Sequence, residues 1–256
     1  MTAVQAAAGT SVLPVPRRPG DDGRPGSRRV PPDPGSAAGA AQRVVHQVLR
    51  RELHLLAELV SWAPPAEAAR TRALTGHADL VGRLLLAHHR LERDVLWPAL
   101  LGAVPDGGQA PLRTAVADWT VRAGRIDAAV RDLGTAARQW AVAGTPAARD
   151  GLALDCRRLA DAVADHTAAE EHDLLPLLDA HLGAAQVSAV ASAASCRLTG
   201  RERRLVLGLA LEDSCAGDRA RILRGLSPPD RLAWRWLGGR RHRADVVRLR
   251  GAPPAR

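Results

Sequence analysis

Two segments of the chain carry the same signature, His-x-x-x-Glu-x-x-x-Leu-x-Pro, and they lie 78 residues apart. The first segment runs from His88 to Pro98, and the second runs from His166 to Pro176. Residues four apart share one face of an α-helix, so each histidine stacks with the glutamate that follows it. The leucine of each signature lies on that face too, which predicts that both polar pairs point into a core. The fold must therefore give the two buried His/Glu pairs partners that offset the energetic cost of burying polar groups.

Apolar residues recur at intervals of three and four in four long segments, which predicts four amphipathic helices. Proline and glycine separate the segments at Pro64–Pro65, at residues 102–110 and at residues 144–146. Short connections make sequential helices antiparallel, so the predicted fold is all-α, an up-down-up-down four-helix bundle with a helical C-terminal extension. The four helices are expected at about residues 42–63, 67–101, 111–142 and 146–182.

The composition predicts three regions. Residues 1–40 contain seven prolines and almost no large apolar side chain after Val15, so we expect a disordered N-terminal tail. Residues 41–183 contain the predicted bundle. Residues 184–256 are expected to form shorter helices that pack on it.

The net charge of +9 is concentrated in the C-terminal region. Residues 197–256 carry 15 arginines against 6 acidic residues, whereas the charges of residues 1–40 and 41–196 cancel. An arginine-rich segment with interleaved tryptophans could bind nucleic acid or a membrane surface. The helical spacing of its apolar residues instead favours packing on the bundle. We therefore expect neither a nucleic-acid nor a membrane partner.

Other functional classes find little support in the sequence. The three cysteines are scattered and form no Cys-x-x-Cys pair, which argues against a disulfide framework and a zinc–thiolate site. No run of 18 apolar residues and no signal-peptide pattern occurs, so we expect a cytoplasmic protein. Nucleotide-binding and hydrolase motifs are absent as well.

A metal ion would compensate both buried pairs. The second and fourth helices of an up-down-up-down bundle run parallel, so their equivalent positions can converge at one depth. A divalent cation binds neutral imidazole and neutralises carboxylate. His46, on the apolar side of the first predicted helix, is the expected further ligand.

With these motifs, the chain resembles the hemerythrin-like, HHE cation-binding family, and its C-terminal part is similar to the long actinobacterial-type members. The resemblance covers about residues 42–251 and implies a di-iron centre inside a four-helix bundle. It rests on VHQVLRREL at 45–53, HHRLERDVLWPAL at 88–100, HTAAEEHDLLPLL at 166–178, LVLGLALED at 205–213 and LSPPDRLAWRWLGGRRH at 226–242.

The resemblance assigns roles to seven residues. Its implied metal ligands are His46, His88, Glu92, His166 and Glu170, with the two glutamates bridging the irons. Two neighbouring residues, His89 and Glu171, are expected to orient the ligands from behind.

The sequence departs from the family pattern in the third helix, where the family places a further histidine. Ala123 aligns with that position, and no histidine occurs between His89 and His166. Asp127 is the nearest carboxylate on the same face, and we expect it to be solvated. The expected ligand set is then three histidines and two glutamates. It could bind two metals with a water in the unfilled position, bind one metal, or bind none.

The resemblance favours an iron-binding protein over an enzyme. Its expected roles are binding or sensing of dioxygen, nitric oxide or peroxide, or the handling of iron. One alternative is a di-iron redox enzyme that uses the unfilled position. Another is a metal-free structural bundle whose basic tail binds nucleic acid.

Overall fold

The computed structural model describes residues 34–193 and 196–251, and every regular element within these ranges is helical. The all-α prediction is therefore confirmed for this part of the chain. Most of the predicted N-terminal tail, residues 1–33, lies outside the described residues. The four longest helices are α1 (Pro34–Ser61), α2 (Ala68–Leu91), α4 (Asp106–Ala143) and α5 (Pro146–Asp173).

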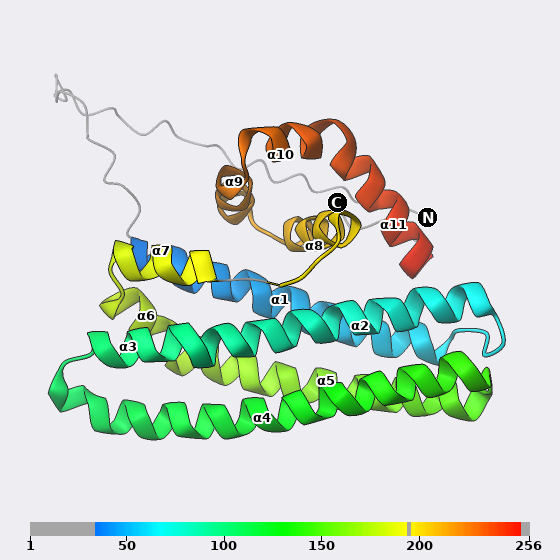
Figure 1. Cartoon of the computed structure of the whole chain (residues 1–256), viewed down its shortest axis with the longest axis horizontal. Coiled ribbons are helices and arrows are strands. Elements are labelled where there is room, and N and C mark those ends of the chain that lie inside the picture. Colours follow the sequence, from blue (N-terminus) through cyan, green and yellow to red (C-terminus); the bar gives the residue numbers. More distant parts are fainter. Residues whose placement is uncertain (1–33, 194–195, 252–256) are drawn as a thin grey trace, which may run out of the picture. The chain divides into compact units, whose positions relative to one another are not determined.

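The four long helices pack side by side (Figure 1). Helix α1 packs along α2 and α5, and α4 packs along the same two helices. Each contributes leucines that are fully buried in the shared core, such as Leu53, Leu85, Leu133 and Leu159. Burial of a leucine side chain contributes roughly 1.5–3 kcal/mol, so these apolar faces are the main source of stability.

Pro98 interrupts the second predicted helix without ending it. Proline has no N–H, and its ring would clash with the carbonyl of Asp94 in a regular helix. A π-helical turn, η1 (Glu92–Leu96), relieves this conflict, because the N–H of Trp97 donates to the carbonyl of Glu92 five residues earlier. Helix α3 (Trp97–Ala103) then continues with Pro98 in its first turn.

Pro176 has a similar effect in the second copy of the signature. Helix α5 ends at Asp173, and α6 (Leu175–His181) begins with Pro176 in its first turn, where a proline is tolerated. Both prolines therefore lie just beyond the His/Glu pairs and redirect the chain there.

A two-residue connection, Gly144–Thr145, joins α4 to α5. Gly144 ends α4 in the left-handed conformation, with φ at +60°, and its N–H donates to the carbonyl of Trp140. The hydroxyl of Thr145 accepts a hydrogen bond from the N–H of Ala148, and Pro146 begins the next helix. The Gly-Thr-Pro sequence thus supplies a helix stop, a cap and a helix start in three consecutive residues.

The apolar core of the long helices is divided into two clusters. On α2, Leu85 belongs to the first cluster, whereas Leu96, just beyond its end, belongs to the second. On α5, Val163 belongs to the first cluster and Leu174 to the second. The residues between these positions include both His/Glu pairs, so a polar layer lies between two apolar ones.

The C-terminal extension is a series of short helices that contacts the long ones (Figure 1). Helices α7 and α8 contact α1, and α11 contacts α2 and α8. No described helix has the length and hydropathy needed to cross a membrane. The elements are α7 (Ala184–Ala193), α8 (Gly200–Glu212), α9 (Ala216–Gly225), α10 (Pro228–Ala233), the π-helical turn η2 (Trp234–Gly238) and α11 (Gly239–Arg250).

A buried carboxylate on α1 ties the extension to the long helices. Oε2 of Glu52 lies 2.9 Å from Nε2 of His77, and Oε1 accepts hydrogen bonds of 2.7 Å from both Arg51 and Arg250. Arg250 also donates to Glu212 of α8. Burial opposes ionisation of Glu52, but the hydrogen bond with His77 and the charges of Arg250 and Arg51 outweigh it and lower the pKa of Glu52 to about 2.

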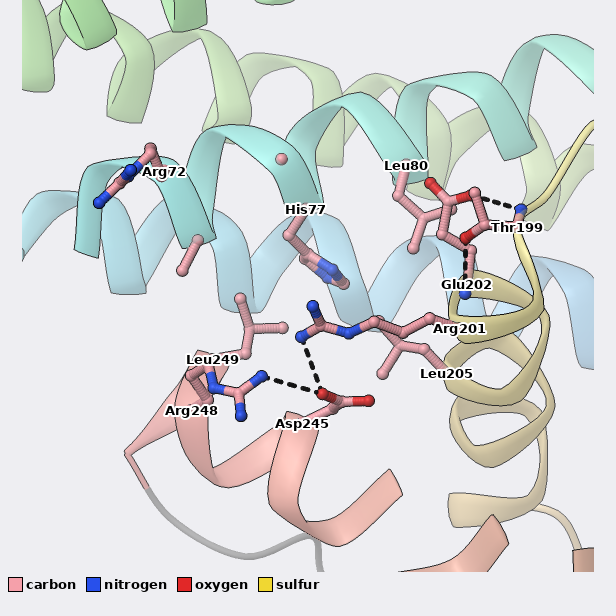
Figure 2. A pocket seen from close by; sticks show the side chains of 12 residues that line it. Arg72, His77, Leu80, Thr199, Arg201, Glu202, Leu205, Asp245, Arg248 and Leu249 are labelled. Carbon is pink, nitrogen blue, oxygen red and sulfur yellow. Dashed lines mark hydrogen bonds and ion pairs between the residues drawn. The ribbon is translucent and has the colours of Figure 1, made fainter. Parts of the chain in front are cut away.

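A charged pocket of about 330 Å³ lies beside this carboxylate, between α2, α8 and α11 (Figure 2). His77 and Leu205 line it from α2 and α8. Asp245 of α11 accepts hydrogen bonds there from Arg201 at 2.8 Å and from Arg248 at 3.2 Å. Charged and apolar side chains therefore both contribute to the contact between the extension and α2 on this side.

We predict that Glu52→Gln destabilises the protein in a pH-dependent manner. The lowered pKa of Glu52 contributes stability that is present above its ordinary value of 4.5 and is lost as the pH falls to about 2. This difference corresponds to about 3 kcal/mol, so the variant should unfold more easily by roughly that amount at pH 7 and should approach the wild type only near pH 2. Denaturant unfolding across this pH range measures the effect.

The matched control is Glu58→Gln, a change of an exposed glutamate on the same helix. It should alter the free energy of unfolding by no more than about 0.5 kcal/mol at any pH. Equal pH dependence of the wild type and Glu52→Gln would contradict the assigned role of Glu52.

Candidate metal centre

A layer of buried imidazoles and carboxylates lies between the two apolar clusters. Each side chain in it belongs to a residue no more than 6% exposed, and together they come from three of the long helices and the π-helical turn. Isolated polar groups at such depth are costly unless each finds a partner. The layer consists of His46 from α1, His88 and His89 from α2, Glu92 from η1, and His166 and Glu170 from α5.

One group of potential ligand atoms brings together all four of these elements. His46, His88, Glu92 and Glu170 each offer an atom, and these four atoms lie within 4.8 Å of one another. Nε2 of His46 lies 3.4 Å from Oε2 of Glu170, and Nε2 of His88 lies 3.1 Å from Oε1 of Glu92. Two imidazoles and two carboxylates therefore face a common point.

A second group shares a glutamate with the first. His89, Glu92 and His166 each offer an atom within 4.8 Å of the others. Nε2 of His166 lies 3.0 Å from Oε1 of Glu170, whose other oxygen approaches His46. Each glutamate thus lies between imidazoles of both groups, which is the placement that a bridging carboxylate requires.

A carboxylate anchors His46 from behind. The Nδ1–H of His46 donates to Oε1 of Glu171 at 3.1 Å, because a carboxylate can only accept. Arg50 donates to the same oxygen at 2.8 Å. The hydrogen bond from His46 and the charge of Arg50 outweigh the effect of burial and lower the pKa of Glu171. This contact fixes the tautomer of His46 and leaves Nε2 free to bind at the centre.

His89 has a matching anchor on α4. Its Nδ1–H donates to Oδ1 of Asp127 at 2.6 Å, and Arg93 donates to Oδ2 at 2.9 Å. Burial raises the pKa of Asp127, but the hydrogen bonds and charges of His89 and Arg93 prevail and lower it. His89 therefore presents Nε2 to the centre in the same manner as His46.

The electrostatics of the layer favour a cation. Burial and the neighbouring Glu170 raise the pKa of Glu92 well above its ordinary value. Burial and three nearby imidazoles hold the pKa of His88 well below its ordinary value. The protein thus provides a neutral imidazole at His88, which can bind a metal, beside a carboxyl group at Glu92 whose ionisation a metal would favour.

The inward-facing atoms of the layer lack hydrogen-bond partners among the described residues. They are Nε2 of all four histidines and both carboxylate oxygens of Glu92 and Glu170. Buried polar atoms are rarely left unpaired in folded proteins. A set of imidazole nitrogens and carboxylate oxygens is suited to iron and similar transition metals, so the residues fit a metal centre.

The third long helix contributes an anchor to the layer. Ala123, at the position that aligns with the family histidine, is fully buried and carries no ligand atom. The expectation that Asp127 is solvated is wrong, because only 8% of this residue is exposed and it accepts from His89. The adjacent histidines, His88 and His89, were the sequence signal for this contact. Adjacent residues of a helix point about 100° apart, so His89 can face α4 while His88 faces α1.

Comparison with known proteins agrees with this geometry. The family described as the hemerythrin HHE cation binding domain matches residues 40–190, which is more than half of the chain and includes the whole polar layer. No curated protein and no solved structure gave a match. The chain belongs to the hemerythrin HHE cation-binding domain family.

Proposed function

We propose that this protein is a hemerythrin-like iron protein that binds two metal ions and a small oxidant such as dioxygen, nitric oxide or peroxide. The observation that carries the proposal is the pair of ligand groups that share Glu92, with their inward-facing atoms buried and without hydrogen-bond partners among the described residues. The ligand types, their burial and the family all agree with it. Iron in this position would supply oxygen binding and one-electron redox chemistry.

The proposal includes the up-down-up-down arrangement of the family. The packing of α1 and α4 along α2 and α5 supports it, as do the short connections between these helices. In this arrangement α2 and α5 run parallel. Their His-x-x-x-Glu pairs, which begin at His88 and His166, then reach the core at one depth.

We further propose that His89 serves as the ligand that the third helix does not provide. Its unpaired Nε2 belongs to a group with Glu92 and His166, and its anchor Asp127 lies one turn beyond Ala123. The centre would then have four histidines and two glutamates. In this chain the second helix would carry the nitrogen ligand, and the third helix would orient it from behind.

The protein also orients the imidazole ligands and keeps water away from the polar layer. Glu171 and Asp127 hold the two anchored imidazoles by their Nδ1–H groups, so both rings keep one tautomer and one direction. The two apolar clusters close the layer from both sides. Low local polarity strengthens each ligand contact and limits proton transfer from water to a bound oxidant.

We predict that protein produced with iron retains about two iron ions per chain. The double variant His88→Ala/Glu92→Ala should lose most of this iron and, with it, the stabilisation by bound metal. That loss should lower the melting temperature by about 5 °C or more, because bound ligand stabilises only the folded state. Elemental analysis and thermal unfolding, with and without a chelator, measure both quantities.

His172→Ala is the control for this experiment. His172 lies on the same helix as His166, but it is exposed and outside both ligand groups. It should retain the wild-type iron content. Wild-type protein with less than about a tenth of an iron per chain, together with an unchanged melting temperature in the double variant, would refute metal binding.

Oxygen uptake distinguishes binding from enzymatic turnover. We predict that the reduced, iron-loaded protein takes up about one dioxygen per pair of irons and releases it on deoxygenation. An oxygen electrode and absorption spectra of the same sample measure uptake and release. Continuous oxygen consumption in the presence of a reductant would instead indicate a di-iron redox enzyme.

The role of His89 has its own prediction. His89→Ala should reduce the iron content from about two ions per chain to about one, because one metal loses one of the two nitrogen ligands in its group. Asp127→Asn keeps the imidazole but removes its anchor, and should weaken binding of that metal by about 10- to 100-fold. Elemental analysis and metal titration give these numbers.

A histidine restored to the third helix provides the matched rescue. Adding Ala123→His to the His89→Ala variant should return the second iron, since it places an imidazole at the position that the family uses. Two firmly bound irons in His89→Ala alone would show that His89 is no ligand. The iron-binding function itself would remain supported by that result.

A further inference from the structure

An apolar pocket of about 250 Å³ lies between α1, α2 and α8. Nine of its twelve lining residues are Val, Leu or Ala, so its wall offers few hydrogen-bonding groups. The exceptions are Gln42, His88 and Cys196. A pocket wall of this kind favours small apolar molecules over polar ones.

The pocket reaches one candidate ligand of the polar layer. Among the six, which the structure describes in full, only His88 lines the pocket. His88 belongs to the ligand group of His46 and Glu170, whereas His89 and His166 belong to the other group. A molecule in the pocket therefore lies beside one half of the centre.

The C-terminal extension forms one wall of this pocket. Val206 and Ala210 line it from α8, and Cys196 lines it from the segment just before that helix. The opposite walls come from the long helices, through residues such as Val45 and Leu84. Access to His88 from this side thus depends on side chains of the extension.

The chemistry of this wall selects among the oxidants considered above. Peroxide is a hydrogen-bond donor and acceptor and would lose its partners in water on entering the pocket. Dioxygen and nitric oxide lose little by the same transfer. The charged pocket beside His77 has the opposite character, because arginine and aspartate side chains line it (Figure 2).

We propose that the pocket between α1, α2 and α8 is a binding and access site for an apolar diatomic gas next to His88. The access role rests on the proposed function. Gas binding in the pocket does not rest on the proposed function, because protein side chains alone form the pocket and no metal is needed to form it. The extension would therefore admit dioxygen or nitric oxide to the half of the centre that contains His46 and His88.

Xenon tests gas binding without any use of iron. Xenon is an apolar probe of similar size, and it should occupy this pocket in the full chain both with and without iron. Val206→Trp fills the pocket from α8 and should abolish xenon binding there. Leu205→Trp is the matched control, since the adjacent residue lines the charged pocket of Figure 2 and should leave xenon binding unchanged.

The rate of gas binding tests access. In reduced, iron-loaded protein, Val206→Trp should slow nitric oxide binding by about tenfold or more, whereas Leu205→Trp should stay within about twofold of the wild type. Both variants should keep the wild-type iron content, because neither residue belongs to the ligand groups. Ala210→Leu is a smaller change in the same wall and should slow nitric oxide binding to a lesser extent. This variant replaces Val206→Trp in the experiment if Val206→Trp does not fold.

The possible outcomes separate the two claims. Absence of xenon from the pocket in wild-type protein would overturn the proposal. Xenon binding with an unchanged rate in the pocket variants would overturn access by this route and leave the iron function intact. A protein that binds xenon but no iron would refute the proposed function and the access role together, while gas binding would stand.

Discussion

The structure depends on the burial of a polar layer inside an otherwise apolar core. Four imidazoles and two carboxylates point their ligand atoms at one another, where water cannot satisfy them. Hydrogen bonds from within the protein reach the layer only from behind, through Nδ1 of His46 and His89. A cation is the one partner that satisfies imidazole nitrogens and carboxylate oxygens together. Helix spacing, proline placement and the outer carboxylates are all consistent with this requirement.

The two anchors show how a ligand set can be conserved in chemistry and redistributed in position. His46 with Glu171 and His89 with Asp127 are equivalent pairs, and an arginine supports each carboxylate. In the second pair the imidazole and the carboxylate come from different helices. A metal is coordinated by donor atoms, and the same donor atom can come from a different helix. Under the proposed role of His89, the third helix lacks a histidine without loss of a nitrogen at the centre.

Much of the fold and half of the centre could be predicted from periodicity. The repeated signature identified the inward faces that carry His88 and His166, because residues four apart share a helical face. The role of His89 could not be predicted in this way, since its direction becomes useful only where α4 presents Asp127. The same limit applies to the Glu52–Arg250 contact, whose partners are 198 residues apart. Contacts between residues so far apart in the sequence do not follow a helical period, so a single sequence does not predict them.

The position of the extension has a consequence for how the protein matures. All six candidate ligands lie between residues 46 and 170, whereas Val206 and Arg250 emerge from the ribosome later. Arg250 follows Glu170 by 80 residues. During synthesis the polar layer can therefore assemble before α8 adds Val206 and Ala210 to the wall next to His88. Under the proposed function, the order of translation would place metal loading before this wall is complete.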